Sequence, residues 1–436
     1  MRILLVGAGG VGAAATGIAA RRNFFERFVV ADYDVARAEQ AVARVGDAQM
    51  GRAQVGDAQM GRAQVGRAQT GDARFVAARV DASSAAAVAA LCREHEITHV
   101  FNAVDPRFVM PIFEGAHAAG ADYLDMAMSL SHPHPDRPYE LTGVKLGDDQ
   151  FAAADRWQAD GRLALVGMGV EPGLSDVFAR YAADHLFSRI DEIGIRDGGN
   201  LVVAGYDFAP SFSIWTTIEE CLNPPVIWEK DRGWYTCEPF AEPEIFDFPG
   251  GIGPVECVHV EHEEVLLIPR WIDAGRVTFK YGLGKEFIDV LKTLHKLGLD
   301  RTAPVTIGGV PVSPRDVVAG VLPDPASLGG QMTGATCAGT LVTGLNKSGM
   351  PAQVYLYHVV DNTWSMREYN AQAVVWQTAV NPVIALELLA TGVWSGAGVL
   401  GPEAFDAVPF LDKLVEYGTP WALREQWPAP VPTAAA

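Results

Sequence analysis

Cysteine is scarce in this sequence of 436 residues, and the few cysteines present form no pattern. There are five, an odd number, and no two of them are spaced as Cys-x-x-Cys. Regularly paired cysteines indicate a disulfide framework, and closely spaced pairs indicate a thiolate metal site. The scattered set argues against both and favours a reducing compartment, so we expect a cytoplasmic protein.

Positive charge and long apolar runs are also limited. Lys and Arg number 34 against 53 Asp and Glu, which gives a formal net charge of −19 at pH 7. An acidic balance disfavours nucleic acid and anionic membrane as partners and tolerates a cationic substrate. The most apolar late stretch, 371–394, is interrupted by Asn381, Pro382 and Glu387, so we expect no membrane span. We expect no signal peptide either, because the first residues already form a core strand.

The first twelve residues carry the most informative pattern. An apolar run, Ile3–Val6, leads into Gly7-x-Gly9-x-x-Gly12, and the Ala-rich stretch 13–20 follows. A buried strand that breaks into this glycine pattern and then into a helix is typical of dinucleotide-binding sites. The first glycine permits a tight turn, the second lets backbone N–H groups approach a pyrophosphate, and the third lets helix and strand pack closely. The helix N-terminus then offers N–H donors to the phosphates.

A second predicted strand, Phe28–Ala31, ends at Asp32, twenty residues after the last glycine of the motif. An acid at this position hydrogen-bonds the ribose hydroxyls of the adenosine and repels a 2′-phosphate. We therefore predict NAD as the cofactor, with NADP left open because Arg37 can reach a 2′-phosphate. The residues expected to bind the cofactor are Gly7, Gly9, Gly10, Val11, Gly12, Asp32, Asn102 and Ala103.

Residues 46–75 form an internal repeat of ten residues. The segment Gly-Asp-Ala-Gln-Met-Gly-Arg-Ala-Gln-Val occurs identically at 46–55 and 56–65, and a degenerate copy follows. The underlying period of five matches neither helix nor strand, and each glycine costs a helix about 1 kcal/mol. We expect a surface insertion without catalytic chemistry, or alternatively an arm that binds a partner.

Strands and helices alternate around this insertion, as in an α/β fold. The expected elements are a helix at 36–44, strands at 75–80, 98–103 and 121–127, and helices at 84–95 and 111–119. This order predicts a Rossmann-type doubly wound parallel sheet, whose ligands bind at the carboxyl ends of the strands. We therefore expect Asn102, Asp105, Asp125 and Met126 near the nicotinamide.

The composition changes after residue 130. A Pro-rich loop at 132–138 is followed by short β-branched and aromatic runs, which indicate largely antiparallel strands. The expected strands include 193–195, 201–204, 245–248, 257–260, 265–268 and 277–281, and an amphipathic helix is expected at 287–297. The predicted domains are a dinucleotide-binding domain at 1–130, an inserted α+β domain at 131–370, C-terminal helices at 371–426 and a disordered tail at 427–436.

Two residues of the second domain are candidate proton carriers. Glu171 precedes Pro172 and Gly173, which favour a rigid turn before a helix that starts near Leu174. His262 lies between acids in a segment expected to be a strand, and carboxylates raise a histidine pKa toward neutral pH. A structural role stays open for both. No third ligand accompanies His262, so we predict no metal site.

Substrate contacts are expected from two further segments. Thr216 and Glu219 are placed to meet an amino or carboxylate group, although Thr217-x-x-Glu220 can equally be a capping box that opens a short helix. Lys280, together with Arg276, is a candidate for binding a substrate carboxylate. Paired charges on a solvated strand face are the alternative for these two cations. Asp176 is expected to be an ordinary helix cap.

Three segments together resemble the saccharopine dehydrogenase-like oxidoreductases, a group that includes lysine 6-dehydrogenase-like and carboxynorspermidine dehydrogenase-like enzymes. They are the opening glycine motif with 101–106 and 118–125, the run Gly167-Met-Gly-Val-Glu-Pro-Gly-Leu-Ser-Asp176, and the run 390–403 with Gly-Val-Leu-Gly-Pro-Glu. The resemblance covers nearly the whole chain except the repeat and the tail. It implies a Rossmann domain interrupted by a domain that binds substrate and mediates dimerisation, hence a homodimer.

The resemblance also implies NAD(P)-linked oxidation or reduction of a C–N bond, through an imine, in an amino acid or an amino-acid/keto-acid conjugate. The catalytic residues expected on this basis are Glu171 and His262 as proton carriers and Asp125 as a residue that orients substrate or nicotinamide. The segment 211–220 gives no substrate code, so saccharopine itself is not implied. Oxidative deamination of a primary amine, as in lysine 6-dehydrogenase-like enzymes, and an inactive nucleotide-binding sensor or scaffold stay open as alternatives.

Overall fold

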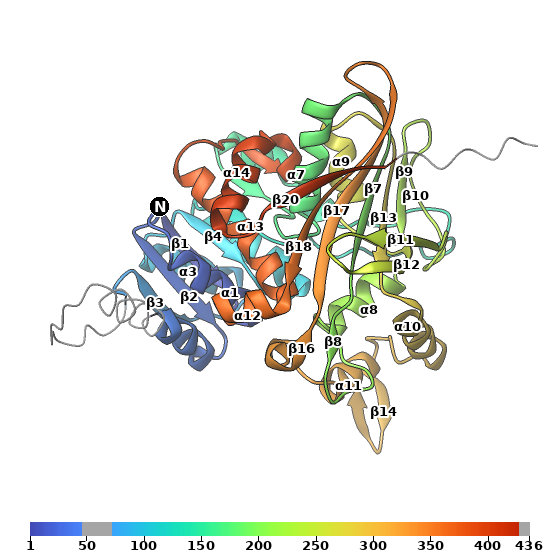
Figure 1. Ribbon diagram of the computed structural model, residues 1–436. Coiled ribbons are helices and arrows are strands. Elements are labelled where there is room, and N and C mark those ends of the chain that lie inside the picture. The colour runs from blue at the N-terminus through green and yellow to red at the C-terminus, as the bar shows by residue number, and fades with distance from the viewer. Residues whose placement is uncertain (46–71, 427–436) are drawn as a thin grey trace, which may run out of the picture. The chain divides into compact units, whose positions relative to one another are not determined.

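The computed structural model describes residues 1–45 and 72–426. Most of the predicted repeat insertion and the predicted tail lie outside these described residues, so the expectations for them stay predictions. Two compact units account for the chain (Figure 1). Unit 1 comprises Met1–Ser129, Asp149–Val166 and Thr378–Leu400, and unit 2 comprises Leu130–Asp148, Gly167–Gln377 and Gly401–Ala436. The predicted domain limits at residues 130 and 370 stay a prediction.

Unit 1 is built on a seven-stranded parallel sheet in the order β19-β6-β5-β4-β1-β2-β3. The strands are β1 (Arg2–Val6), β2 (Arg27–Asp32), β3 (Phe75–Arg79), β4 (His99–Asn102), β5 (Asp122–Leu124), β6 (Leu163–Leu165) and β19 (Gly398–Leu400). Their short apolar runs are mostly buried, as in sheets covered on both faces. The strand order reverses between β1 and β4, which confirms the predicted doubly wound sheet.

Helices connect these strands, close to the predicted limits. They are α1 (Gly10–Ala19), a helix at 35–45, α3 (Ala85–Glu94), the short η1 (Pro106–Phe108), α4 (Val109–Ala118), α5 (Asp148–Phe151) and α6 (Ala154–Ala159). Ser84 caps α3, because its hydroxyl accepts a hydrogen bond from the N–H of Ala87 at 3.2 Å.

The long apolar helix α13 (Ala373–Ala390) differs from expectation in one respect. By length and composition it qualifies as a candidate membrane span despite its polar residues, although 83% of it is buried inside the protein. A buried core helix meets the same criteria of length and composition. Glu387 of this helix accepts two hydrogen bonds of 2.8 Å from the Arg22 guanidinium, both within unit 1.

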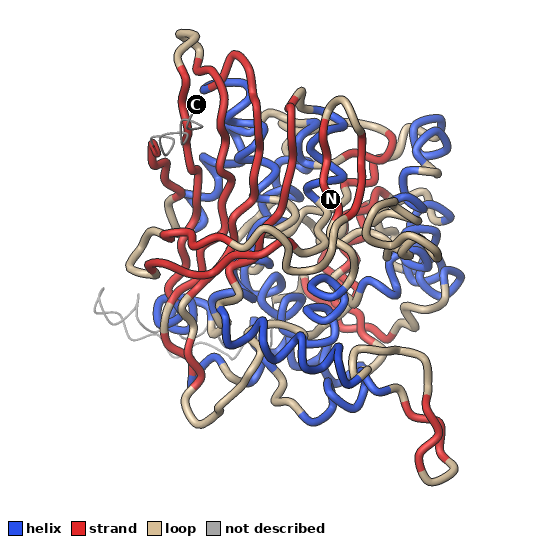
Figure 2. Tube along the Cα trace, turned by 90° about the vertical axis from the view of Figure 1, so that its right-hand side faces the viewer, coloured by secondary structure: helices blue, strands red, loops and turns tan. Residues whose placement is uncertain are grey.

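Unit 2 contains a nine-stranded mixed sheet whose main path runs β10-β9-β13-β7-β17-β18-β20. The long strands β7 (Phe187–Gly199), β17 (Ala335–Asn346) and β18 (Pro351–Asp361) pair antiparallel, whereas β13 (Ala274–Gly282) pairs with β7 in parallel. Figure 2 shows long strands lying side by side. The other strands of unit 2 are β8 (Val202–Val203), β9 (Val226–Glu229), β10 (Gly233–Thr236), β11 (Glu244–Phe248), β12 (Gly253–His259), β14 (Val305–Ile307), β15 (Val310–Val312), β16 (Met332–Thr333) and β20 (Trp421–Gln426).

The helices of unit 2 include two that pack on this sheet, α7 over β17 and α9 over β13. The α-helices are α7 (Leu174–Tyr181), α8 (Ile214–Leu222), α9 (Glu264–Trp271), α10 (Lys285–Leu297), α11 (Pro314–Val321), α12 (Asn362–Tyr369) and α14 (Ala407–Tyr417). Together with the Rossmann-type sheet of unit 1, this second mixed sheet with its helices confirms the predicted fold class.

Three predicted features of unit 2 are wrong, of which two concern helices α8 and α9 and the third concerns the segment around His262. The run Val265–Ile268 is the buried middle of helix α9 and not a strand, since a short apolar run that is buried on all sides has no period that separates helix from strand. Helix α8 begins before the predicted capping box at 217–220. Ser213 is its N-cap and accepts from the N–H of Thr216, so Thr217 lies inside the helix.

Candidate functional site

The turn between β1 and α1 leaves no room for side chains at two of its three motif glycines. A Cβ on Gly7, whose φ is +102°, would lie 2.6 Å from the carbonyl oxygen of Ala103. A Cβ on Gly12 would lie 1.9 Å from the carbonyl oxygen of Gly7. A Cβ on Gly9, in contrast, would have nothing within 4 Å and would project into open space. This is the space through which a pyrophosphate reaches the backbone.

The N-terminus of α1 suits an anion. Gly9 is its N-cap, no side chain caps it, and its first turn contains no acid, so Gly10 and Val11 present N–H groups that no intrahelical carbonyl can satisfy. Asp32 lies beside this turn, where its Oδ2 accepts from the N–H of Ala8 at 2.8 Å. The residues present therefore fit a dinucleotide.

The predicted polar residues at the carboxyl ends of β4 and β5 have partners within unit 1. Asn102 donates to the hydroxyl of Tyr123 at 2.9 Å and accepts from the N–H of Val104 at 3.1 Å. Asp125 is buried, and its Oδ2 accepts from Nε2 of Gln150 at 2.7 Å. These bonds show how both side chains are positioned, and the catalytic role of Asp125 stays a prediction.

Unit 2 contains a cavity of about 140 Å³ whose lining carries two acids and no Lys or Arg among the described residues. Its polar lining residues are Glu171, Asp197, Ser211, Thr217, Tyr281, Thr336 and Gln377. Thr216, Glu219 and Lys280 are not part of this lining. An ammonium group matches such a lining better than a carboxylate does.

Glu171 reaches this cavity from the turn before α7. The turn requires glycine at its end, since Gly173 has a φ of +132° and a Cβ there would lie 2.2 Å from the carbonyl oxygen of Gly169. Asp176 accepts from the N–H of Gly173 at 2.7 Å, which is the capping role expected for it. Within residues 1–45 and 72–426, the buried Oε2 of Glu171 has no hydrogen-bond partner.

The carboxyl groups of Glu171 and Asp197 are hydrogen-bonded to each other. Burial, followed by the negative charge of Asp197 and then of Glu264, raises the pKa of Glu171 well above its ordinary value. Burial also raises the pKa of Asp197 to about 8, although His262 and the N–H of Gly198 oppose the rise. The pair therefore retains a proton at pH values at which exposed carboxyl groups have lost theirs.

His262 does not lie on a strand, contrary to expectation, but in the loop between β12 and α9. Its buried ring stacks on Phe279 with a centroid distance of 3.8 Å, and its Nδ1 lies 2.6 Å from Oε2 of Glu264. The other oxygen of Glu264 accepts from the hydroxyl of Ser175 at 2.7 Å. Burial lowers the pKa of His262, but Glu264, followed by other acids, outweighs it and raises the pKa to about 10. This environment favours a fixed positive charge over a proton carrier.

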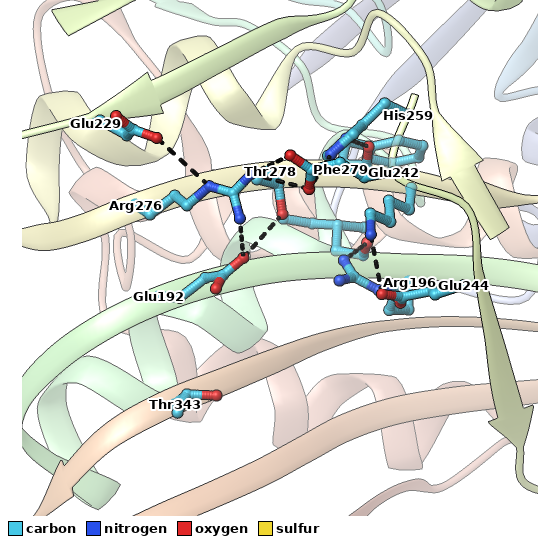
Figure 3. A network of polar contacts seen from close by, with 12 residues as sticks. Glu192, Arg196, Glu229, Glu242, Glu244, His259, Arg276, Thr278, Phe279 and Thr343 are labelled. Carbon is cyan, nitrogen blue, oxygen red and sulfur yellow. Dashed lines mark hydrogen bonds and ion pairs between the residues drawn. The ribbon is translucent and has the colours of Figure 1, made fainter. Parts of the chain in front are cut away.

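The remaining predicted substrate residues have partners elsewhere in unit 2. Glu219 is ion-paired with Arg315 and accepts from Nδ2 of Asn223 at 3.1 Å. Lys280 lies 2.9 Å from Glu244. The neighbouring Arg276 contacts Glu242, as Figure 3 shows. The structure thus gives Lys280 and Arg276 the paired-charge role that the sequence left open.

Asp197, Tyr281, Thr336 and Gln377 are polar residues of the cavity that the sequence did not single out. The available signal was an acid next to a cation in the run Ile193-Gly-Ile-Arg-Asp-Gly-Gly199, between β-branched residues and a pair of glycines. In residues 1–45 and 72–426, no group of three or more His, Cys, Asp or Glu side chains is arranged to bind a metal ion.

Comparisons with known proteins match both parts of the chain. The saccharopine dehydrogenase NADP binding domain matches residues 3–165, and the saccharopine dehydrogenase C-terminal domain matches residues 169–419. A solved structure, apo histidine-tagged saccharopine dehydrogenase (L-Glu forming) from Saccharomyces cerevisiae, is similar with a TM-score of 0.65 at 13% identity. It covers 98% of this chain and 100% of its own, which supports the fold alone.

Curated relatives are similar over most of the sequence. Carboxynorspermidine synthase from Vibrio alginolyticus is 30% identical over 80% of this chain and 83% of its own length. Carboxynorspermidine synthase from Vibrio cholerae is 28% identical over 98% of both chains. Carboxyaminopropylagmatine dehydrogenase from Synechocystis is 27% identical over 96% of both.

Proposed function

Because the chain belongs to the saccharopine dehydrogenase family, we propose that it oxidises or reduces the C–N bond of a small amine that carries at least one further positive charge. Family membership confirms the predicted nicotinamide-dependent oxidoreductase that acts on C–N bonds. The further positive charge of the substrate is our own proposal.

The residues that line the cavity of unit 2 support a substrate with a further positive charge. Two acids face the cavity, and neither Lys nor Arg lines it among the described residues, so an ammonium group is stabilised there and a carboxylate is not. The names of the curated relatives are consistent with this, since norspermidine and agmatine are compounds with several basic groups. A conjugate of two amino acids would bring more carboxylates than this cavity can pair.

The residues of the chain have distinct proposed roles. The glycine turn and the start of α1 bind the dinucleotide, which when bound supplies or accepts the hydride. Glu171 exchanges a proton with the substrate nitrogen, because its Oε2 is unpaired and its pKa is raised. Thr217 and Gln377 orient the substrate from α8 and α13 through their polar groups.

We also propose a cytoplasmic homodimer that prefers NAD. Free thiols at all five cysteines support the reducing compartment. The position of Asp32 beside the glycine turn supports NAD, whereas the matching domain is described as NADP binding. Titrations with both cofactors decide between them.

The test is nicotinamide absorbance with NADH and NADPH against diamines alone, carbonyl compounds alone, and the two together. Oxidation of the reduced cofactor only with a diamine and an aldehyde or keto acid is the expected result. Reduction of NAD or NADP by a single amine with ammonia release indicates the lysine 6-dehydrogenase-like alternative. Cofactor binding without turnover across the panel contradicts the proposal.

The variant Glu171→Gln, measured in the same assay, tests whether Glu171 carries the proton. We expect kcat to fall by roughly 10²- to 10⁴-fold, as for loss of a general acid or base, with cofactor affinity unchanged. Glu140→Gln is the matched control, since Glu140 is an exposed acid of unit 2 that pairs with Arg137. An unchanged pH–rate profile in Glu171→Gln would exclude Glu171 as the carrier.

A further inference from the structure

Two carboxyl groups from distant parts of the chain meet at the cavity of unit 2. Glu171 comes from the turn before α7, and Asp197 comes from β7, next to Tyr281 in the paired strand β13. Both acids line the cavity, and their carboxyl groups are within hydrogen-bonding reach of each other. Among the described residues the Oε2 of Glu171 has no hydrogen-bond partner. A hydrogen bond between two carboxyl groups requires that one of them carries a proton.

The charges around this pair keep that proton in place. Glu264 on α9 adds negative charge near Glu171, and so does Glu220 on α8 once it is ionised. His262 is the positive group near Asp197, but its Nδ1 is engaged by Glu264. The other neighbours that bear on the cavity are the phenol of Tyr281, the acid Glu263 and the buried thiols of Cys221 and Cys337. The pair therefore lies in a region with more acids than cations.

We propose that Glu171 and Asp197 form a dyad that holds one shared proton in the free protein and exchanges it for the ammonium group of the substrate. Two ionised carboxylates this close repel each other strongly, but a cation between them removes the repulsion. Asp197 is thus a further substrate-binding residue. This inference rests on the proposed amine substrate and specifies how the amine is bound.

The proton balance of the exchange is explicit. The amine arrives as R–NH₃⁺, the dyad loses its shared proton to solvent, and the bound pair consists of one ammonium and two carboxylates. When the nitrogen has to react as a neutral amine, it returns one proton to the dyad, which then carries a single negative charge. No bond to carbon changes in these steps, and no oxidant or reductant is consumed.

The exchange is measured by titration calorimetry of the cofactor-bound protein with α,ω-diamines of increasing length. Each titration at neutral pH is repeated in two buffers that differ in ionisation enthalpy, because the difference in heat gives the number of protons released. We expect release of about one proton per bound diamine in the unaltered protein. We expect the release to vanish as the pH rises above the range in which the dyad keeps its proton.

Asp197→Asn removes one acid of the dyad at nearly constant volume. We expect proton release to be lost and diamine affinity to fall roughly 10- to 100-fold, the loss typical of a hydrogen bond to a charged group. Asp191→Asn is the matched control on the same strand, since Asp191 is exposed and pairs with Arg189. Unchanged binding of the nicotinamide cofactor by Asp197→Asn shows that the variant is folded.

The outcomes separate this inference from the proposed function. Diamines that bind or turn over without proton release in the unaltered protein overturn the dyad and leave the amine reaction standing. Proton release that persists in Asp197→Asn also overturns the dyad. If no diamine binds and none is turned over, the proposed cationic amine substrate fails, and the dyad proposal fails with it.

Discussion

Three glycine-to-alanine substitutions at the start of the chain separate folding from cofactor binding. Gly9, Gly12 and Gly17 lie within nine residues of one another at the start of and inside helix α1, but an added methyl group meets different surroundings at each. At Gly12 it would lie 1.9 Å from the carbonyl oxygen of Gly7, whereas ordinary contacts of a Cβ begin at 3.4 Å. At Gly9 and Gly17 it would have nothing within 4 Å.

These distances set the expected magnitudes. Gly12→Ala must push the turn away from the helix, so we expect a loss of about 1–3 kcal/mol or more in the free energy of unfolding, together with loss of the cofactor. Gly17→Ala lies inside the helix and is expected to stabilise by about 0.5–1 kcal/mol. Gly9→Ala is expected to change stability by less than about 1 kcal/mol. It places a methyl group where the pyrophosphate approaches, so cofactor affinity is expected to fall roughly 10- to 100-fold.

Thermal melts without cofactor and fluorescence titrations with NADH and NADPH measure the two effects independently. The expected order is that Gly17→Ala keeps both properties, Gly9→Ala keeps stability alone, and Gly12→Ala loses both. Cofactor affinity of Gly9→Ala within twofold of the unaltered protein would refute the placement of the phosphates, with about 1.4 kcal/mol corresponding to each tenfold change. Normal melting of Gly12→Ala would refute the geometry of the turn.

Three further outcomes are expected. In the folded protein the pKa values of Asp197 and Glu220 are raised to about 8 and that of His262 to about 10. The unfolded chain loses these protons at lower pH. The free energy of unfolding therefore falls as pH rises from about 5 to 10, and Glu220→Gln flattens this slope in melts across that range. Leu267→Ala, in the fully buried face of α9, is expected to cost about 2–5 kcal/mol in denaturant unfolding. Glu387→Gln breaks the paired hydrogen bonds with the Arg22 guanidinium and is expected to cost about 1–3 kcal/mol in the same measurement.

The nucleotide-binding half of the protein was predictable because its signals are local. Gly7 and Gly12 are each required by a close backbone contact, with Ala103 after β4 and with Gly7 itself, whereas Gly9 leaves open space above the turn. The strands are short apolar runs bounded by helices. The strand order then follows from the small number of ways in which such units connect. Glu171 was also found locally, through the Pro and Gly that define its turn.

The second half was less predictable because its decisive contacts are distant in sequence. Val265–Ile268 carries no period that distinguishes helix from strand, and only its burial within unit 2 selects the helix. The strand predicted around His262 was wrong for the same reason, since this segment is the loop between β12 and helix α9. The sequence left Lys280 open between binding a substrate carboxylate and pairing with another charge, and only the pairing of the strands brings Glu244 within 2.9 Å of it.

The sequence by itself therefore determined the family, the dinucleotide turn and one acid of the cavity. Only the tertiary structure decided that a second acid, Asp197, meets Glu171 at the cavity, and that no Lys or Arg of the described residues lines it. The physical reason is that a glycine motif acts through its own backbone, whereas the state of a buried acid depends on the charges that folding places around it.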